Sequence, residues 1–222
     1  MKARTTLAGC VVACATVFAA CGSPPPAPDW QLDMESALDA HERHRLAGRL
    51  TLAEQDFSRA RDAVSATGRP EIAARVQLVR CAVASAALDF AACPEPRGIA
   101  REAGPEEQAY AAYLAGAWDG LDVARVPPVH GAIVEAGDAV GRLAALRAIE
   151  GTTSRLVAAA ALFRRSALPP SGIDLAVDTA SAAGHRGALL PWLGVQEKVA
   201  ITAGDAARAA SIRRRIELAT PP

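Results

Sequence analysis

Residues 48–60, GRLTLAEQDFSRA, combine a glycine, a helix-start signal and a helical pattern of apolar residues. Thr51 and Glu54 have the spacing of a capping box, in which the threonine side chain bonds the first turn and the glutamate reaches back. Phe57 and Ala60 follow at helical spacing on the apolar face. The stretch therefore predicts a helix that buries Phe57 and Ala60.

Further helices are predicted on both sides of this stretch, each with small or apolar residues at three- and four-residue steps. Asp29 is expected to cap the first of them. Aromatic residues make up only 4% of the chain, which disfavours strands. Loops of two to five residues imply antiparallel neighbours. The predicted helices cover residues 30–47, 51–67, 70–87, 129–136, 138–150, 152–166, 171–183, 187–203 and 205–219, and another begins at Pro105.

Residues 48–60 resemble the second half of a tetratricopeptide repeat. A small residue lies at the turn, and Ala53, Phe57 and Ala60 follow where two helices would touch. Residues 204–216 repeat part of this spacing, with an arginine in place of the aromatic residue. The resemblance implies an all-α fold of antiparallel helical hairpins, in a tetratricopeptide-like α-solenoid or a compact right-handed superhelix. Such folds hold partner segments in a groove.

The first twenty residues have the composition of a cleavable secretory signal. Lys2 and Arg4 form a basic start, and residues 7–20 contain no charged side chain. This apolar run is about fourteen residues long, whereas a helix that spans a bilayer needs roughly twenty. We expect residues 1–20 to be a signal peptide that is removed.

Cys21 follows Phe18-Ala19-Ala20, and this junction resembles a bacterial lipoprotein signal. The resemblance implies a lipid-modified Cys21 that anchors the protein to a membrane, and Gly22 favours the outer membrane facing the periplasm. An earlier candidate, Cys10, has too few apolar residues before it. The alternative is an ordinary signal that is cut after Ala20 and leaves Cys21 free.

Three segments are expected along the chain: the signal at 1–20, a proline-rich tether at 21–29 and a single helical-repeat domain at 30–222. Loss of the signal removes Lys2 and Arg4, so the 24 basic residues fall to 22 against 24 acidic ones. A net charge near −2 provides no basic surface for nucleic acid, which excludes a nucleic-acid partner.

Cys81 and Cys93 are the cysteines that remain beyond the signal and Cys21. An even pair in an oxidising compartment predicts a disulfide. Because bridged Cα atoms lie within about 7 Å, the helix that contains Cys81 must end near Ala87 so that the chain can turn back. The alternative is a pair of buried thiols.

No combination of residues identifies a reaction, a metal site or a cofactor site. His41 and His44 lie three residues apart beside acidic residues, but a structural metal needs about four ligands, and a solvated charged face is the preferred interpretation. The remaining candidate site residues also have an ordinary structural explanation. Glu135, Glu150 and Glu197 fit ordinary helix surfaces, and Arg213, Arg214 and Arg215 fit the dipole of a helix C-terminus.

The sequence therefore favours a non-enzymatic, lipid-anchored periplasmic protein that acts as an adaptor or scaffold for an envelope protein or peptide, without cofactor or metal. One alternative is an envelope enzyme or small-ligand carrier whose site assembles from distant helices. The other is a purely structural lipoprotein. Converging carboxylates or histidines in a pocket would favour the ligand carrier, and an open groove would favour the adaptor.

Overall fold

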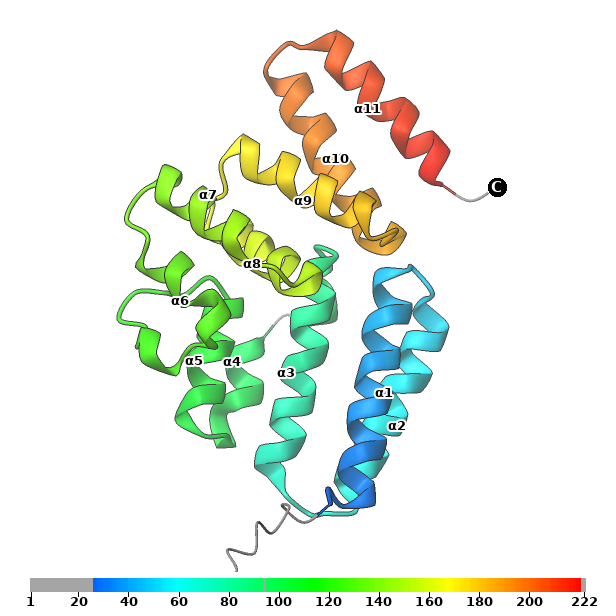
Figure 1. Cartoon of the computed structure of the whole chain (residues 1–222), viewed down its shortest axis with the longest axis vertical. Helices are drawn as coiled ribbons and strands as arrows, with labels where there is room; N and C mark the ends of the chain where they lie inside the picture. Colours follow the sequence, from blue (N-terminus) through cyan, green and yellow to red (C-terminus); the bar gives the residue numbers. More distant parts are fainter. Residues whose placement is uncertain (1–25, 94, 221–222) are drawn as a thin grey trace, which may run out of the picture.

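The structure is a computed structural model that describes residues 26–93 and 95–220. The predicted signal peptide and Cys21 lie outside these ranges. The described residues form eleven α-helices and three short 3-10 helices and contain no strand, which confirms the all-α prediction (Figure 1). The α-helices are α1 (Asp29–Leu46), α2 (Leu50–Ser65), α3 (Pro70–Ala86), α4 (Pro96–Ile99), α5 (Pro105–Leu114), α6 (Pro128–Glu135), α7 (Ala139–Ala148), α8 (Thr152–Arg164), α9 (Pro170–Ala182), α10 (Arg186–Thr202) and α11 (Ala206–Ala219). The 3-10 helices are η1 (Phe90–Ala92), η2 (Ala100–Glu102) and η3 (Val123–Arg125).

The helices α1 and α2 form an antiparallel hairpin that packs beside α3 (Figure 1). A small core joins the three helices through Phe57 and Ala60 of α2, Ala37 of α1 and Val76 of α3. Phe57 and Ala60 are buried, as predicted from their helical spacing. Ala60 has no long side chain, so the helices can approach one another closely at this position.

Helix α3 lies in the middle of the molecule, between the α1/α2 hairpin and the helices α4 to α8 (Figure 1). A larger core extends from its C-terminal half into α5, α8, α9 and α10. Trp192 of α10 is fully buried there, and its Nε1 donates a hydrogen bond of 2.9 Å to the carbonyl oxygen of Ala86. This bond satisfies a buried indole N–H and ties α10 to the end of α3.

Two glycines allow the α1/α2 turn to contact the first turn of α10. Gly48 has a φ of 81°, a conformation that L side chains rarely adopt. A Cβ added to Gly187 would lie 2.6 Å from both the carbonyl oxygen of Arg45 and the nitrogen of Gly48. Glycine is therefore required at Gly187 for this approach of backbone to backbone.

The C-terminal helices continue as a row in which α10 packs against both α9 and α11 (Figure 1). Gly184 and Gly204, both with positive φ, lie in the two turns between these helices. Pro191 lies inside α10, five residues beyond its first residue.

The predicted helix bounds agree with the observed ones within two residues, but the predicted N-caps of α1 and α2 are wrong. Asp29 is the first residue of α1, and its predecessor has no side-chain cap bond. Thr51 lies inside the first turn of α2, which begins one residue earlier without a side-chain cap. Glu54 reaches across to α3 instead, where Arg80 donates to its carboxylate at 3.1 Å.

Among the described residues, none of the helices combines the length and apolar character that crossing a bilayer requires. The expected anchor at Cys21 lies outside the described ranges.

Candidate functional site

A polar pocket of about 490 Å³ lies where six helices from distant parts of the chain meet. Its apolar wall is formed by Val79, Ala82 and Val83 of α3 and by Val157 of α8. Its polar lining consists of Glu42 of α1, Tyr110 of α5, His130 of α6, Thr152, Thr153 and Ser154 of α8, and His185, which directly precedes α10. We refer to this site as the central pocket.

Glu42 contacts the start of α8 in the lining of the central pocket. The hydroxyl of Thr153 donates a hydrogen bond of 2.6 Å to Oε1 of Glu42. Gly151, the residue before α8, has no side chain with which to cap the helix. As in every α-helix, the first backbone N–H groups of α8 have no intrahelical acceptor and carry a partial positive charge, and here the preceding residue gives them no side-chain cap. The carboxylate lies close enough to this end to complement that charge.

His130 is a buried side chain in which one ring nitrogen forms no hydrogen bond with a described residue. It is 3% exposed, and its Nδ1 has no hydrogen-bond partner among the described residues. The ring stacks on Tyr113, with the two ring centres 4.8 Å apart. Burial lowers the pKa of His130 to about 4, so the imidazole is neutral at neutral pH.

Tyr110 and His185 complete the polar lining in their neutral forms. Burial, with a smaller contribution from the charge of Glu42, raises the pKa of Tyr110 well above its usual value. Burial also lowers the pKa of His185, although the charge of Glu42 opposes that shift. Glu42 is the only Asp, Glu, Lys or Arg among the described residues that line the pocket. The site therefore combines one carboxylate with several neutral donors and acceptors.

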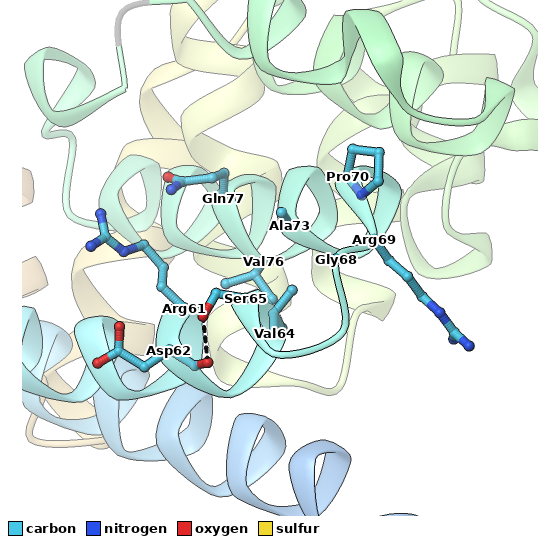
Figure 2. A pocket seen from close by; sticks show the side chains of 10 residues that line it. All are labelled: Arg61, Asp62, Val64, Ser65, Gly68, Arg69, Pro70, Ala73, Val76 and Gln77. Carbon is cyan, nitrogen blue, oxygen red and sulfur yellow. Dashed lines mark hydrogen bonds between the residues drawn. The ribbon is translucent and has the colours of Figure 1, made fainter.

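A second hollow, of about 590 Å³, runs between the end of α2 and the start of α3. Figure 2 shows Arg61 and Arg69 toward opposite ends of this α2/α3 groove. Val64, Ala73 and Val76 supply its apolar floor. Neither arginine forms an ion pair with a carboxylate of the described residues.

The predicted cysteine pair lies together in the structure. Cys81 and Cys93 are at disulfide distance, with their Cα atoms 5.2 Å apart. Helix α3 ends at Ala86 and the η1 turn brings Cys93 back, which is the reversal that the prediction required. Alkylation of the unreduced protein is expected to label neither cysteine. The other predicted site residue, Cys21, lies outside the described ranges.

The predicted solvated face at His41 and His44 is wrong. His41 is 1% exposed and its Nδ1 donates a hydrogen bond of 2.8 Å to the carbonyl oxygen of Ala53. Burial lowers its pKa, which keeps this ring neutral. His44 donates to Asp56 at 2.6 Å. Both histidines therefore join α1 to α2, and the described residues contain no group of three or more potential metal ligands.

The acidic residues considered from the sequence do not line the central pocket. Glu135 and Glu150 are exposed, and Glu197 accepts an ion pair of 2.8 Å from Arg213. The predicted role of Arg213, Arg214 and Arg215 at a helix C-terminus is also wrong, because no basic residue lies in the last turn of α11. The sequence interpretation missed Glu42, His130 and His185. The one local signal was the run Gly151-Thr152-Thr153-Ser154, which places hydroxyl groups at a helix start.

Comparison with known proteins gives no relative: the chain matches no protein-family model, no curated protein and no solved structure.

Proposed function

We propose that the helical domain binds a small polar ligand in the central pocket. The observation that carries the proposal is the convergence of Glu42, His130 and His185, which come from α1, α6 and the residue before α10. Ligand sites are typically concave, of about 300–1,000 Å³, with a few converging polar groups among apolar ones. The central pocket has this size and this mixture. The proposal corresponds to the ligand-carrier alternative that the sequence leaves open.

The proposed activity is binding without turnover. Enzymes that cleave glycosides commonly use two carboxyl groups at the scissile bond. The described lining of the central pocket contains one, Glu42, and its Oε1 is engaged by Thr153. His130 and Tyr110 are held in their neutral forms by burial, which suits them to orient a ligand through hydrogen bonds.

We propose that the domain acts in the bacterial envelope, held at the periplasmic face of the outer membrane by lipid on Cys21. The composition of residues 1–20 and the Phe18–Cys21 junction support this placement. The tether at 21–29 would keep the domain near the bilayer, because nine residues extend only about 3 nm.

An adaptor is the second candidate, and the α2/α3 groove favours it. Its apolar floor and the arginines at its ends, Arg61 and Arg69, suit an apolar segment of a partner protein that carries acidic residues. The partner segment would lie along the groove between α2 and α3 (Figure 2).

One experiment separates the two candidates. The lipidated protein is purified from its native host, and an envelope extract of that host is divided into a small-molecule fraction and a protein fraction. The ligand carrier predicts that the small-molecule fraction raises the melting temperature, and that Glu42→Gln reduces this rise while Glu135→Gln, on an exposed helix surface, does not.

The adaptor predicts a different result in the same experiment. Crosslinking with the protein fraction would then recover one reproducible partner, and Ala73→Glu in the α2/α3 groove would remove it. A partner recovered in this way, together with no response to the small-molecule fraction, would contradict the ligand carrier.

A further inference from the structure

We infer that the ligand of the central pocket is a neutral, hydroxyl-rich molecule of the carbohydrate class. This inference rests on the proposed function and names the chemistry of its ligand. It follows from three properties of the lining: which groups donate, which accept, and how the charges balance.

Donor groups are concentrated at the start of α8. The first N–H groups of this helix have no intrahelical acceptor, and Gly151 provides no side-chain cap. The hydroxyls of Thr152 and Ser154 lie beside them in the pocket lining. A ligand at this end must therefore offer acceptor atoms to several donors.

Acceptor groups lie on the other elements of the pocket. The Glu42 carboxylate accepts from Thr153 through Oε1, and Oε2 forms no hydrogen bond with a described residue. A neutral imidazole has one acceptor nitrogen, and burial keeps both His130 and His185 shifted toward that form. A ligand must therefore donate hydrogen bonds as well as accept them.

The charges of the pocket favour a neutral ligand. An anion would meet Glu42, the only Asp, Glu, Lys or Arg in the described lining. A cation would meet the start of α8, whose partial charge is equivalent to about +0.5, and would leave its donors unsatisfied. A hydroxyl group both donates and accepts, so it matches either side without a net charge.

The apolar wall fits the remaining surface of such a ligand. Val79, Val83 and Val157 line the pocket together with Tyr110. A sugar ring has carbon-bound hydrogens on its faces and hydroxyls around its edge, so it can cover this wall while its edge reaches α8 and Glu42. A pocket of about 490 Å³ has room for a molecule of this size.

The test measures binding to the full chain, expressed with its own signal and purified in detergent. The probes are neutral monosaccharides (methyl glucoside, methyl galactoside and N-acetylglucosamine), with inorganic phosphate and ethylammonium as charged alternatives. Affinity is measured by calorimetry, and NMR of the histidine rings reports where each probe binds. We expect at least one sugar to bind and to shift the signals of His130 and His185.

Gly151→Ser is the most informative variant, because it should lower the affinity for the sugar without damaging the fold. A Cβ at this position meets nothing closer than 3.4 Å, and the extended backbone of Gly151 suits a capping serine. The new hydroxyl would accept a bond from the start of α8 and compete with the ligand. We expect a higher melting temperature and roughly tenfold weaker sugar binding, since a bond of about 1.4 kcal/mol corresponds to tenfold. The control is Gly137→Ser, an exposed position with no atom nearby, which should change neither quantity.

Failure of this inference differs from failure of the proposed function. Binding of phosphate or ethylammonium at His130 and His185, with no sugar bound, would overturn the carbohydrate class and leave a ligand carrier. If no probe and no small-molecule extract changes these histidine signals, both proposals are overturned. Equal sugar binding by Gly151→Ser and the unaltered chain would contradict the role of α8.

Discussion

The central pocket and the α2/α3 groove are hollows of similar size that are built in different ways. The groove lies between two consecutive helices joined by one turn, and its lining spans residues 61–77. The lining of the central pocket extends from Glu42 to His185 and involves six α-helices or their flanking residues. The groove therefore depends mainly on local packing, whereas the pocket exists only if α1, α8 and α10 are held around α3. Variants that loosen these long-range contacts should damage the pocket and spare the groove.

Loss of Trp192 should have the largest effect, because this side chain joins α10 to α3. Trp192→Ala is expected to lower the free energy of unfolding by about 3–5 kcal/mol, through a large cavity and a lost hydrogen bond to Ala86. Trp30→Ala is the matched control. Trp30 is only half-buried on α1, so its loss should lower the free energy of unfolding by less. Urea unfolding measures both variants. Equal losses would contradict the role of Trp192 in holding α10.

Acid should destabilise the pocket region through His130. The unfolded chain takes up a proton at this residue below a pKa of about 6.5, whereas the folded protein takes it up only near 4. Stability from the neutral ring is therefore fully present above pH 6.5 and is lost as the pH falls toward 4, by about 3 kcal/mol.

Comparison with His130→Gln isolates this contribution, because His41 is shifted in the same direction. The unfolding free energy of the unaltered chain should fall more steeply between pH 6.5 and 4 than that of the variant. Parallel curves for the two proteins would show that His130 is not the group responsible.

Gly187→Ala tests the contact between the α1/α2 turn and α10. The added Cβ would lie 2.6 Å from backbone atoms of Arg45 and Gly48, so the two elements must separate. We expect a loss of about 1–3 kcal/mol in unfolding free energy and weaker ligand binding in the pocket. Gly194→Ala lies on the same helix with no neighbouring atom, and it should gain up to about 1 kcal/mol. Similar stabilities for both variants would show that the close contact is not maintained in solution.

The smallest expected difference concerns helix caps. Asp205 caps α11 by accepting a hydrogen bond of 2.9 Å from the backbone of Arg208, and Asp205→Ala should cost about 1 kcal/mol. Thr51 makes no cap bond, so Thr51→Ala should change the free energy of unfolding by less than about 0.5 kcal/mol. A loss of about 1 kcal/mol at Thr51 would instead support the capping box that the sequence predicts.

Helix positions could be predicted from the sequence because they depend on local patterns. Glycines at helix ends, prolines at helix starts and the spacing of Phe57 and Ala60 all act within one or two turns. The Cys81–Cys93 approach was predictable for the same reason, since it needs only a helix end between them. The cap of α2 was not predictable, because the packing of α2 against α3 directs Glu54 toward Arg80.

The central pocket could not be predicted because its residues carry no local signal. Glu42 lies on a helix rich in charged residues, and His130 and His185 are isolated in the sequence. Their meeting depends on contacts such as Gly48 with Gly187, which no helical spacing reveals. The burial of His41 could not be predicted either. Its neighbours in the sequence are charged, and they do not indicate that its ring bonds the carbonyl oxygen of Ala53 in another helix.

The most direct test of the ligand carrier is NMR of the four histidine rings before and after addition of the small-molecule fraction of an envelope extract. His41 and His44 lie between α1 and α2, outside the central pocket, and serve as internal controls. The proposed function predicts that the signals of His130 and His185 change while those of His41 and His44 stay in place. No change at His130 and His185, or an equal change at all four histidines, would contradict it.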